Sequence, residues 1–337
     1  MIGVLGIALS LVLLMYLAYR GINVLVLAPI LALLAALFGG EPRLLATYTQ
    51  ILMTGLGGFL VKYFPLFLLG AIFGRVMSDS GAAATIARSI ATGLGVGRAL
   101  FAIVASCAIL TYGGVSVFVV IFAIYPIATV LLREAAIPKR LLPGAATLGA
   151  ATFTMTAFPG TPAVQNAIPM PHFGTDPFAA PGIGVIAGLM MAAFGLWWLR
   201  RRARQAAERS EGYGHHPFDP GLDQAAVAGP GLGAALIPIV AVIGINWAVP
   251  RFVIPAMDVG YLAEPKYGPT TLNQVRGIWA LVIALTVGIA LGIVLNARRW
   301  RDLKGTVNGG TMSSLLPIFN TASEVGYGSV IASLAGF

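Results

Sequence analysis

The chain is dominated by long apolar runs that alternate with short polar or basic segments. Residues 2–19 and 22–38 are almost free of polar side chains, and each run approaches the ~20 residues that a helix needs to cross a bilayer. Transmembrane strands instead alternate apolar and polar positions, and these runs are unbroken. The pattern therefore predicts an all-α, polytopic membrane bundle.

Further apolar runs predict further helices at residues 63–77, 99–132, 141–157, 182–199, 231–249 and 277–295, and residues 305–337 close the chain. Residues 82–94 mix apolar with polar positions, which predicts an amphipathic helix at the membrane surface. The block at 99–132 is interrupted at 111–116. Its two arms, of about 13 and 16 residues, suit either two full crossings or a re-entrant hairpin.

Composition sharpens this picture. Hydrophobic residues make up 58% and charged residues 10%, against ~45–50% and ~25% in soluble domains, so soluble, disordered and nucleic-acid-binding proteins are excluded. The net charge of +9 comes from clusters at the ends of apolar runs, such as Arg200–Arg204, and basic clusters are typical of cytoplasmic loops. A single cysteine, Cys107, excludes an internal disulfide and a cysteine metal site.

A weak internal repeat suggests the domain organisation. Residues 113–121 resemble residues 323–331, at an offset of 210. We predict N-terminal scaffold helices (1–60), a first repeat (61–199) with a hairpin at 99–132 and a broken helix at 158–169, a hydrophilic linker (200–230), and a second repeat (231–337) with a helix break at 320–326. At this offset the later part of the first repeat has no counterpart, so we expect the chain to be C-terminally incomplete.

Three interruptions in apolar flanks, at 111–116, 158–169 and 320–326, are the candidate functional segments. Unwound backbone inside a bilayer must be satisfied by protein or water, and transporters place it at substrate sites, where helix N-termini face anionic groups. The alternative for 158–169 is a proline-rich surface loop. The predicted substrate-binding residues are Gly113, Gly114, Ser116, Thr161, Gln165, Asn166, Asn320, Thr321 and Ser323.

Two titratable residues are candidates for proton coupling. Glu324 lies in a segment without other charges, and a carboxylate inside a membrane marks a functional site by default. The alternative is a capping box with Thr321 at a helix start. His172 follows the second interruption and is either a proton relay or a loop residue.

Enzyme signatures are absent from the sequence, including zinc-protease, nucleophile-elbow, Walker and dinucleotide motifs. We therefore predict no enzyme activity, no cofactor and no metal site, and transport driven by an ion gradient. The alternatives are a sodium-coupled carboxylate transporter, a non-transporting membrane subunit or an inactive fragment.

The runs TMTAFPGTP at 154–162 and NTASEVGYG at 320–328 resemble the gluconate:proton symporter (GntP-type) permease family of the ion transporter superfamily, over essentially the whole chain. The resemblance implies multi-pass proteins of the bacterial inner membrane that import gluconate, 3-hydroxybutyrate or related hydroxy acids with protons. It also implies two inverted repeats with re-entrant hairpins, and a homodimer.

Two departures from the family pattern matter. Family chains are longer, and gluconate permeases carry a Glu-Val-Gly run where this chain has Tyr112-Gly113-Gly114-Val115. We therefore expect a small organic acid other than gluconate as the substrate. The other expected partners are protons or Na⁺ and the lipid bilayer, with no nucleic acid.

Overall fold

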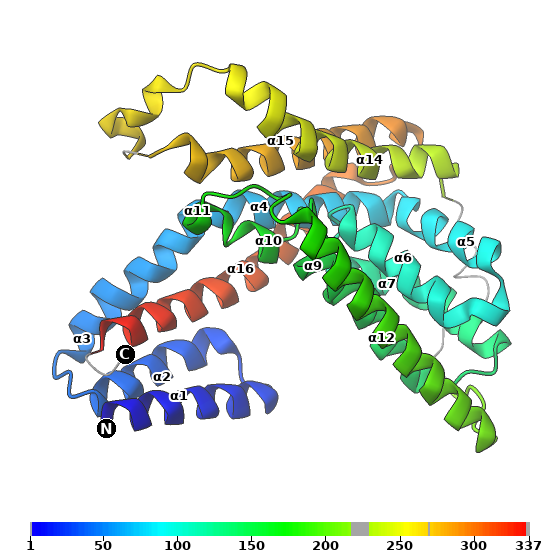
Figure 1. The fold of residues 1–337 in the computed structure, drawn as a ribbon, viewed down its shortest axis with the longest axis horizontal. Helices are drawn as coiled ribbons and strands as arrows, with labels where there is room; N and C mark the ends of the chain where they lie inside the picture. The colour runs from blue at the N-terminus through cyan, green and yellow to red at the C-terminus, as the bar shows by residue number, and fades with distance from the viewer. Residues whose placement is uncertain (1, 217–228, 269, 335–337) are drawn as a thin grey trace. The chain divides into compact units, whose positions relative to one another are not determined.

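The computed structural model describes residues 2–216, 229–268 and 270–334, which are helical with no strands in that part of the chain (Figure 1). The chain forms two compact units: Met1–Leu68 with Met312–Phe337, and Leu69–Thr311. Two helices, α4 (Met53–Asp79) and α16 (Leu303–Ser333), run from one unit into the other.

The remaining longer helices follow the apolar runs. They are α1 (Ile2–Tyr19), α2 (Val24–Phe38), α5 (Ala82–Leu94), α6 (Ala99–Tyr112), α7 (Val117–Glu134), α8 (Leu142–Ala151), α12 (Pro181–Glu208), α14 (Leu232–Ala248) and α15 (Leu272–Leu295). Short helices are α3 (Leu44–Ala46), α9 (Phe153–Thr156), α10 (Val164–Ala167) and α11 (Met170–Phe173).

Tighter or wider turns connect these elements. The π-helical segments are η1 (Thr47–Leu52) and η4 (Val249–Val253). The 3-10 segments are η2 (Val96–Arg98), η3 (Lys139–Leu141), η5 (Ile254–Ala256), η6 (Gly260–Ala263), η7 (Pro265–Tyr267) and η8 (Ala297–Arg299).

The described helices confirm a polytopic membrane protein. Four stretches are long and apolar enough to cross a membrane: Leu44–Asp79, Pro181–Glu208, Leu232–Ala256 and Leu272–Leu295. The pair α5 and η2–α6, bent by 107°, is a fifth if counted as one broken span. The predicted repeats and their inversion stay predictions.

The unit that holds the N-terminus is built on α1, α2, η1 and the second part of α16. Apolar residues of α2 pack in one cluster with Leu52 and Val330. The buried hydroxyls of Ser10 and Tyr327 share a hydrogen bond of 2.6 Å. Gly326 lets α16 approach η1, since a Cβ atom there would lie 2.7 Å from the Leu52 carbonyl oxygen.

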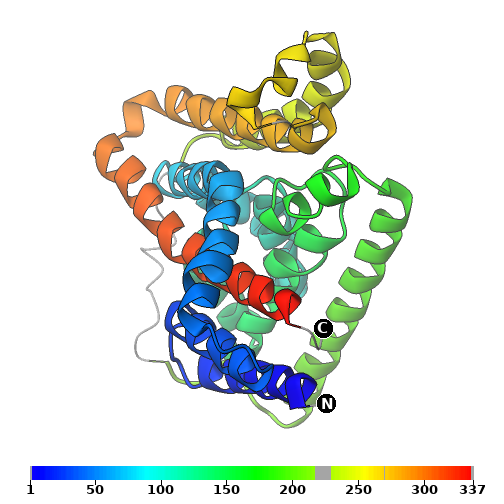
Figure 2. The same cartoon turned by 90° about the vertical axis from the view of Figure 1, so that its left-hand side faces the viewer.

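The unit of Leu69–Thr311 contains most of the core. Helices α5 to α8 pack through small and branched apolar residues, and α14 lies beside α15 (Figures 1 and 2). A Cβ atom at Gly149 would collide with the Val104 carbonyl, and one at Gly288 would collide with the Val242 side chain. These glycines therefore permit the close helix contacts that are typical of membrane bundles.

The predicted linker at 200–230 is wrong at its start. Helix α12 continues to Glu208, because arginine, alanine, glutamine and glutamate are good helix formers even where hydropathy falls. Arg140 then holds Glu211 through two hydrogen bonds of 2.6 and 2.7 Å, and Arg133 lies over the Tyr213 ring at 5.2 Å. Residues 217–228 of the linker lie outside the described part.

The predicted helix break at 320–326 is also wrong, because α16 is continuous from Leu303 to Ser333. The segment contains no proline, so nothing removes backbone donors or blocks the helix. Thr321 and Ser329 instead donate their hydroxyl protons to the carbonyls of Pro317 and Val325 in the same helix.

Several long helices carry an internal proline without ending there. These prolines are Pro29 in α2, Pro65 in α4, Pro126 in α7, Pro238 in α14 and Pro317 in α16. Each lacks the backbone N–H that would bond to the carbonyl four residues earlier.

Candidate functional site

Non-helical backbone is present at two of the three predicted interruptions, both in the unit of Leu69–Thr311. Helix α6 ends at Tyr112 and α7 begins at Val117, with Gly114 at a φ of +95°. After α9, residues 157–163 are not helical, and only the single turns α10 and α11 follow before α12. Prolines at 159, 162 and 169 explain why no longer helix forms there.

The two interruptions contact each other. The Tyr112 hydroxyl donates a 2.6 Å hydrogen bond to the Pro159 carbonyl oxygen, and the Tyr112 ring meets the Phe158 ring edge to face at 6.3 Å. A Cβ atom at Gly114 would lie 2.9 Å from Cγ of Pro162. Segments 47 residues apart in sequence therefore form one region of unwound backbone.

Asn166 holds the second interruption in shape. Its Nδ2 donates to the carbonyl oxygens of Thr161 at 3.0 Å and Pro177 at 3.1 Å. The Gly160 N–H donates to the same Pro177 carbonyl at 2.6 Å, and Thr161 is completely buried. The sequence-predicted Thr161 and Asn166 thus lie in one bonded network.

Helix α14 adds a residue that the sequence analysis missed. Asn246 is completely buried, and its Nδ2 donates to the Gly160 carbonyl at 3.0 Å. Its Oδ1 and the buried Thr111 Oγ1 have no hydrogen-bond partner within the described chain. Unpaired buried polar atoms are rare in folded proteins and call for a ligand or water. A single amide in the apolar run 231–249 was the available sequence signal.

Two arginines flank the second interruption. Arg276, in the first turns of α15, donates from Nη2 to the Gly174 carbonyl at 3.2 Å, while its buried Nε has no partner in the described residues. Arg251 of η4 lies 5.0 Å over the Phe178 ring and donates to the Trp247 carbonyl. Both arginines lie far along the chain from the prolines of the second interruption, so the sequence alone did not connect them.

The other predicted residues of this unit differ in their surroundings. Gly113 faces α14, where a Cβ atom would lie 2.5 Å from Cγ2 of Ile239. Ser116 precedes α7 and is half-buried, with its backbone nitrogen 3.2 Å from the Cβ position of Gly74. Gln165 and His172 are exposed.

The remaining four predicted residues lie on α16 in the unit that holds the N-terminus. Asn320 Oδ1 and Ser323 Oγ are buried without a described partner, and the Thr321 hydroxyl bonds within its own helix. Glu324 is exposed. Since the helix runs well past Glu324 on both sides, the capping-box alternative is wrong.

Comparison with known proteins agrees with the membrane architecture. The model of the "GntP family permease" family matches residues 1–261. The "Uncharacterized transporter YxjC" of Bacillus subtilis (strain 168) is 40% identical over 344 residues, covering 98% of this chain and 73% of that protein. No solved structure matches. The chain therefore belongs to the GntP permease family, and it is a transporter rather than an enzyme.

Proposed function

We propose that this permease is a secondary active transporter that imports a small organic anion together with protons. The substrate class is that of gluconate, 3-hydroxybutyrate and related hydroxy acids, and the Tyr112-Gly113-Gly114-Val115 run favours a member other than gluconate itself. The observation that carries the proposal is the hydrogen bond from Tyr112 to Pro159, which joins two interrupted segments within an apolar unit.

The polar groups around this junction suit a carboxylate with hydroxyl substituents. Amide and hydroxyl groups of Thr111, Asn166 and Asn246 supply neutral hydrogen-bonding partners. The guanidinium of Arg276 supplies positive charge with one donor atom still free, and arginine binds carboxylates in a forked geometry. These groups together favour an anion over a cation or an apolar solute.

Proton coupling is assigned to Glu324, with His172 as a second candidate. Glu324 is the one carboxylate between Asp302 and the C-terminus of the sequence, and it has no ionic or hydrogen-bond partner in the described chain. A proton-carrying carboxylate must be free to exchange its proton with water and substrate. The bacterial inner membrane, the inverted repeats and a homodimer belong to the same proposal, by analogy with the family.

Uptake into proteoliposomes tests the substrate and its site. An inward proton gradient should drive accumulation of at least one labelled hydroxy acid. Asn166→Ala should raise the half-saturating concentration about tenfold, since the segment loses the two hydrogen bonds, of ~0.5–1.5 kcal/mol each, that hold its shape. Arg276→Gln should raise it about 10–100-fold, as loss of a charged hydrogen bond costs ~1.5–3 kcal/mol. Arg298→Gln, an exposed arginine beyond the other end of α15, is the matched control.

The coupling ion needs separate variants. Glu324→Gln should abolish accumulation driven by the proton gradient but keep substrate exchange between the two sides. Glu134→Gln removes an exposed carboxylate at the end of α7 and should leave both accumulation and exchange unchanged. Accumulation that follows a sodium gradient at fixed pH, with Glu324→Gln unaffected, would instead support the sodium-coupled alternative. No accumulation of any organic anion would refute the proposal.

A further inference from the structure

The basic end of α12 forms a pocket that the transport function does not use. The pocket has a volume of ≈ 300 Å³ and lies between the start of α6, the loop after α7 and α12. Its lining residues are Gly97, Arg98, Ala99, Leu100, Phe101, Ile137, Arg200, Ala203 and Arg204. Its volume is at the lower end of the ~300–1,000 Å³ that small-ligand sites occupy.

The lining separates into a charged rim and an apolar floor. Arg98, Arg200 and Arg204 are exposed, and no hydrogen bond or ion pair engages their guanidinium groups within the described chain. Ala99 and Leu100 are buried beneath them. Three unpaired guanidinium groups above an apolar surface fit a ligand that is itself amphiphilic, with an anionic group next to a hydrocarbon part.

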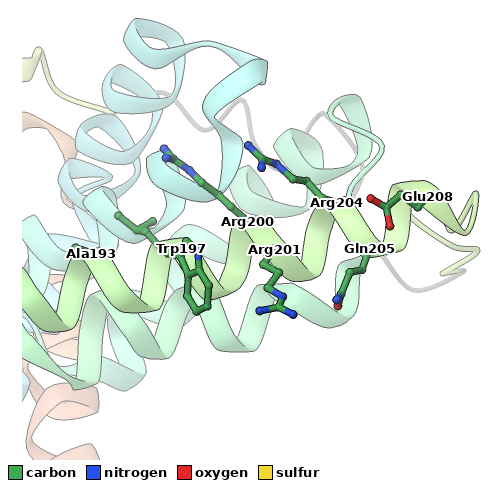
Figure 3. A pocket seen from close by; sticks show the side chains of 8 residues that line it. Ala193, Trp197, Arg200, Arg201, Arg204, Gln205 and Glu208 are labelled. Carbon is green, nitrogen blue, oxygen red and sulfur yellow. The ribbon is translucent and has the colours of Figure 1, made fainter.

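A groove of ≈ 710 Å³ continues along α12 from the same arginines. Arg200 and Arg204 are four residues apart and project from the same side of the helix, opposite to Arg201 (Figure 3). Ala193 and Leu196 line the groove before them, and Glu208 lines its far end. Along the groove, apolar side chains therefore give way to guanidinium groups and then to a carboxylate.

The position of the groove on α12 identifies the surrounding medium. The helix exposes large apolar side chains toward its N-terminal part, with Ile186 62% and Met190 68% exposed, as expected of a surface that faces lipid. Trp197 and Trp198 follow, with Arg201 and Arg202 over their rings at 5.6 and 5.9 Å. Tryptophan and arginine next to an apolar run mark the headgroup level of the bilayer.

We infer that this pocket binds the phosphate of an anionic phospholipid, with Arg98, Arg200 and Arg204 around the phosphodiester and the glycerol and first acyl carbons on the apolar floor. Guanidinium groups bind phosphate oxygens through charge-assisted hydrogen bonds, and basic pockets between membrane helices hold anionic headgroups in this way. The charge and the apolar surface each match one part of the lipid.

Native mass spectrometry of the purified full-length protein tests this site. The probes are phosphatidylglycerol, phosphatidylcholine with the same acyl chains, and glycerol 3-phosphate. Arg200→Gln/Arg204→Gln should weaken phosphatidylglycerol binding roughly thirtyfold, since each arginine contributes ~1 kcal/mol. Arg202→Gln/Arg209→Gln removes the same charge from residues that do not line the pocket and should change binding less than about threefold.

A third variant protects the test against misfolding of α12. Arg98→Gln, on η2 rather than α12, should weaken phosphatidylglycerol binding about fivefold. Equal losses in the two double variants would overturn the proposal, because binding would then depend on overall charge. Equal binding of the two lipids by the unsubstituted protein would also overturn it. Displacement of the lipid by equimolar glycerol 3-phosphate would assign the pocket to a soluble phosphate ester instead.

Discussion

Gly114 offers the sharpest test of the junction between the two interrupted segments. It ends α6 with a φ of +95°, and its N–H and that of Val115 bond to the carbonyls of Thr111 and Leu110. This is the pattern of a Schellman motif, in which glycine occupies the position with left-handed backbone angles. A methyl group added there would meet Cγ of Pro162 at 2.9 Å. Gly114→Ala therefore combines backbone strain with a steric overlap.

The two contributions can be separated with Gly21→Ala. Gly21 has a φ of +89°, forms the same pair of hydrogen bonds through Ile22, and has open space at its Cβ position. Left-handed strain costs about 1–3 kcal/mol in both variants. Overpacking against Pro162 adds about 1–3 kcal/mol in Gly114→Ala alone. The free energy of unfolding of Gly114→Ala should therefore be lower than that of Gly21→Ala by the overpacking cost of about 1–3 kcal/mol.

Chemical unfolding in detergent measures the stability, and hydroxy-acid uptake measures the function. Gly114→Ala should be the less stable variant and should transport poorly, whereas Gly21→Ala should keep its uptake. In a double-mutant cycle, Pro162→Ala should relieve part of the loss of stability caused by Gly114→Ala, with a coupling energy of more than ~0.5 kcal/mol. If the two alanine variants are equally stable and the cycle shows no coupling, the contact between the interruptions does not exist in the folded protein.

Three further outcomes follow from single contacts. Tyr327→Phe should lower the free energy of unfolding by about 0.5–1.5 kcal/mol, because the buried Ser10 hydroxyl loses one of its two hydrogen bonds and keeps only the bond to the Ile7 carbonyl; unchanged stability would contradict the bond to Tyr327. The hydrogen bond from Arg140 holds the pKa of Glu211 below its usual range. The contact that attaches residues 209–216 should therefore be intact above the pKa that Glu211 has in the unfolded chain, and it should be lost as the pH falls through the lowered pKa of the folded protein. Limited proteolysis should then increase in acid, and Arg140→Gln should make it high at every pH. Cys107 is completely buried in α6 and should resist maleimide until the protein unfolds; rapid labelling of the native protein would contradict the packing.

The sequence predicted helices best where hydrophobicity alone determines them. The first two helices begin and end within two residues of the predicted bounds, because each is one uninterrupted apolar run between polar turns. It was less accurate at α12, whose last nine residues are arginine, alanine, glutamine and glutamate yet helical. Hydropathy reports where a chain meets lipid, whereas helix propensity decides where the helix ends.

Proline content distinguishes the predicted interruption at 158–169, which is present in the structure, from the one at 320–326, which is not. The segments 158–169 and 320–326 both combine small and polar residues, but only the first contains prolines. Hydroxyl side chains can bond to the carbonyls of their own helix, as Thr321 does, so polarity alone does not end a helix in an apolar environment. Three prolines at 159, 162 and 169 remove several backbone donors within one short segment, whereas the single Pro317 removes one and α16 continues through it.

The candidate site could be predicted only in part, because several of its contacts join residues that are far apart in the sequence. Thr161 and Asn166 stood next to their prolines in the sequence. Asn246 donates to the Gly160 carbonyl from 86 residues away, and Arg276 donates to the Gly174 carbonyl from 102 residues away. No local pattern reports such contacts, and the one available signal for Asn246, a lone amide in an apolar run, was not used.

The prolines inside α4 and α16 have a mechanical consequence. These two helices are the covalent links that continue from one unit into the other, and each carries its proline close to the crossover, at Pro65 and Pro317. A turn that lacks a hydrogen bond bends more easily than an intact one. The turns at Pro65 and Pro317 are therefore the places along these two helices where bending costs least.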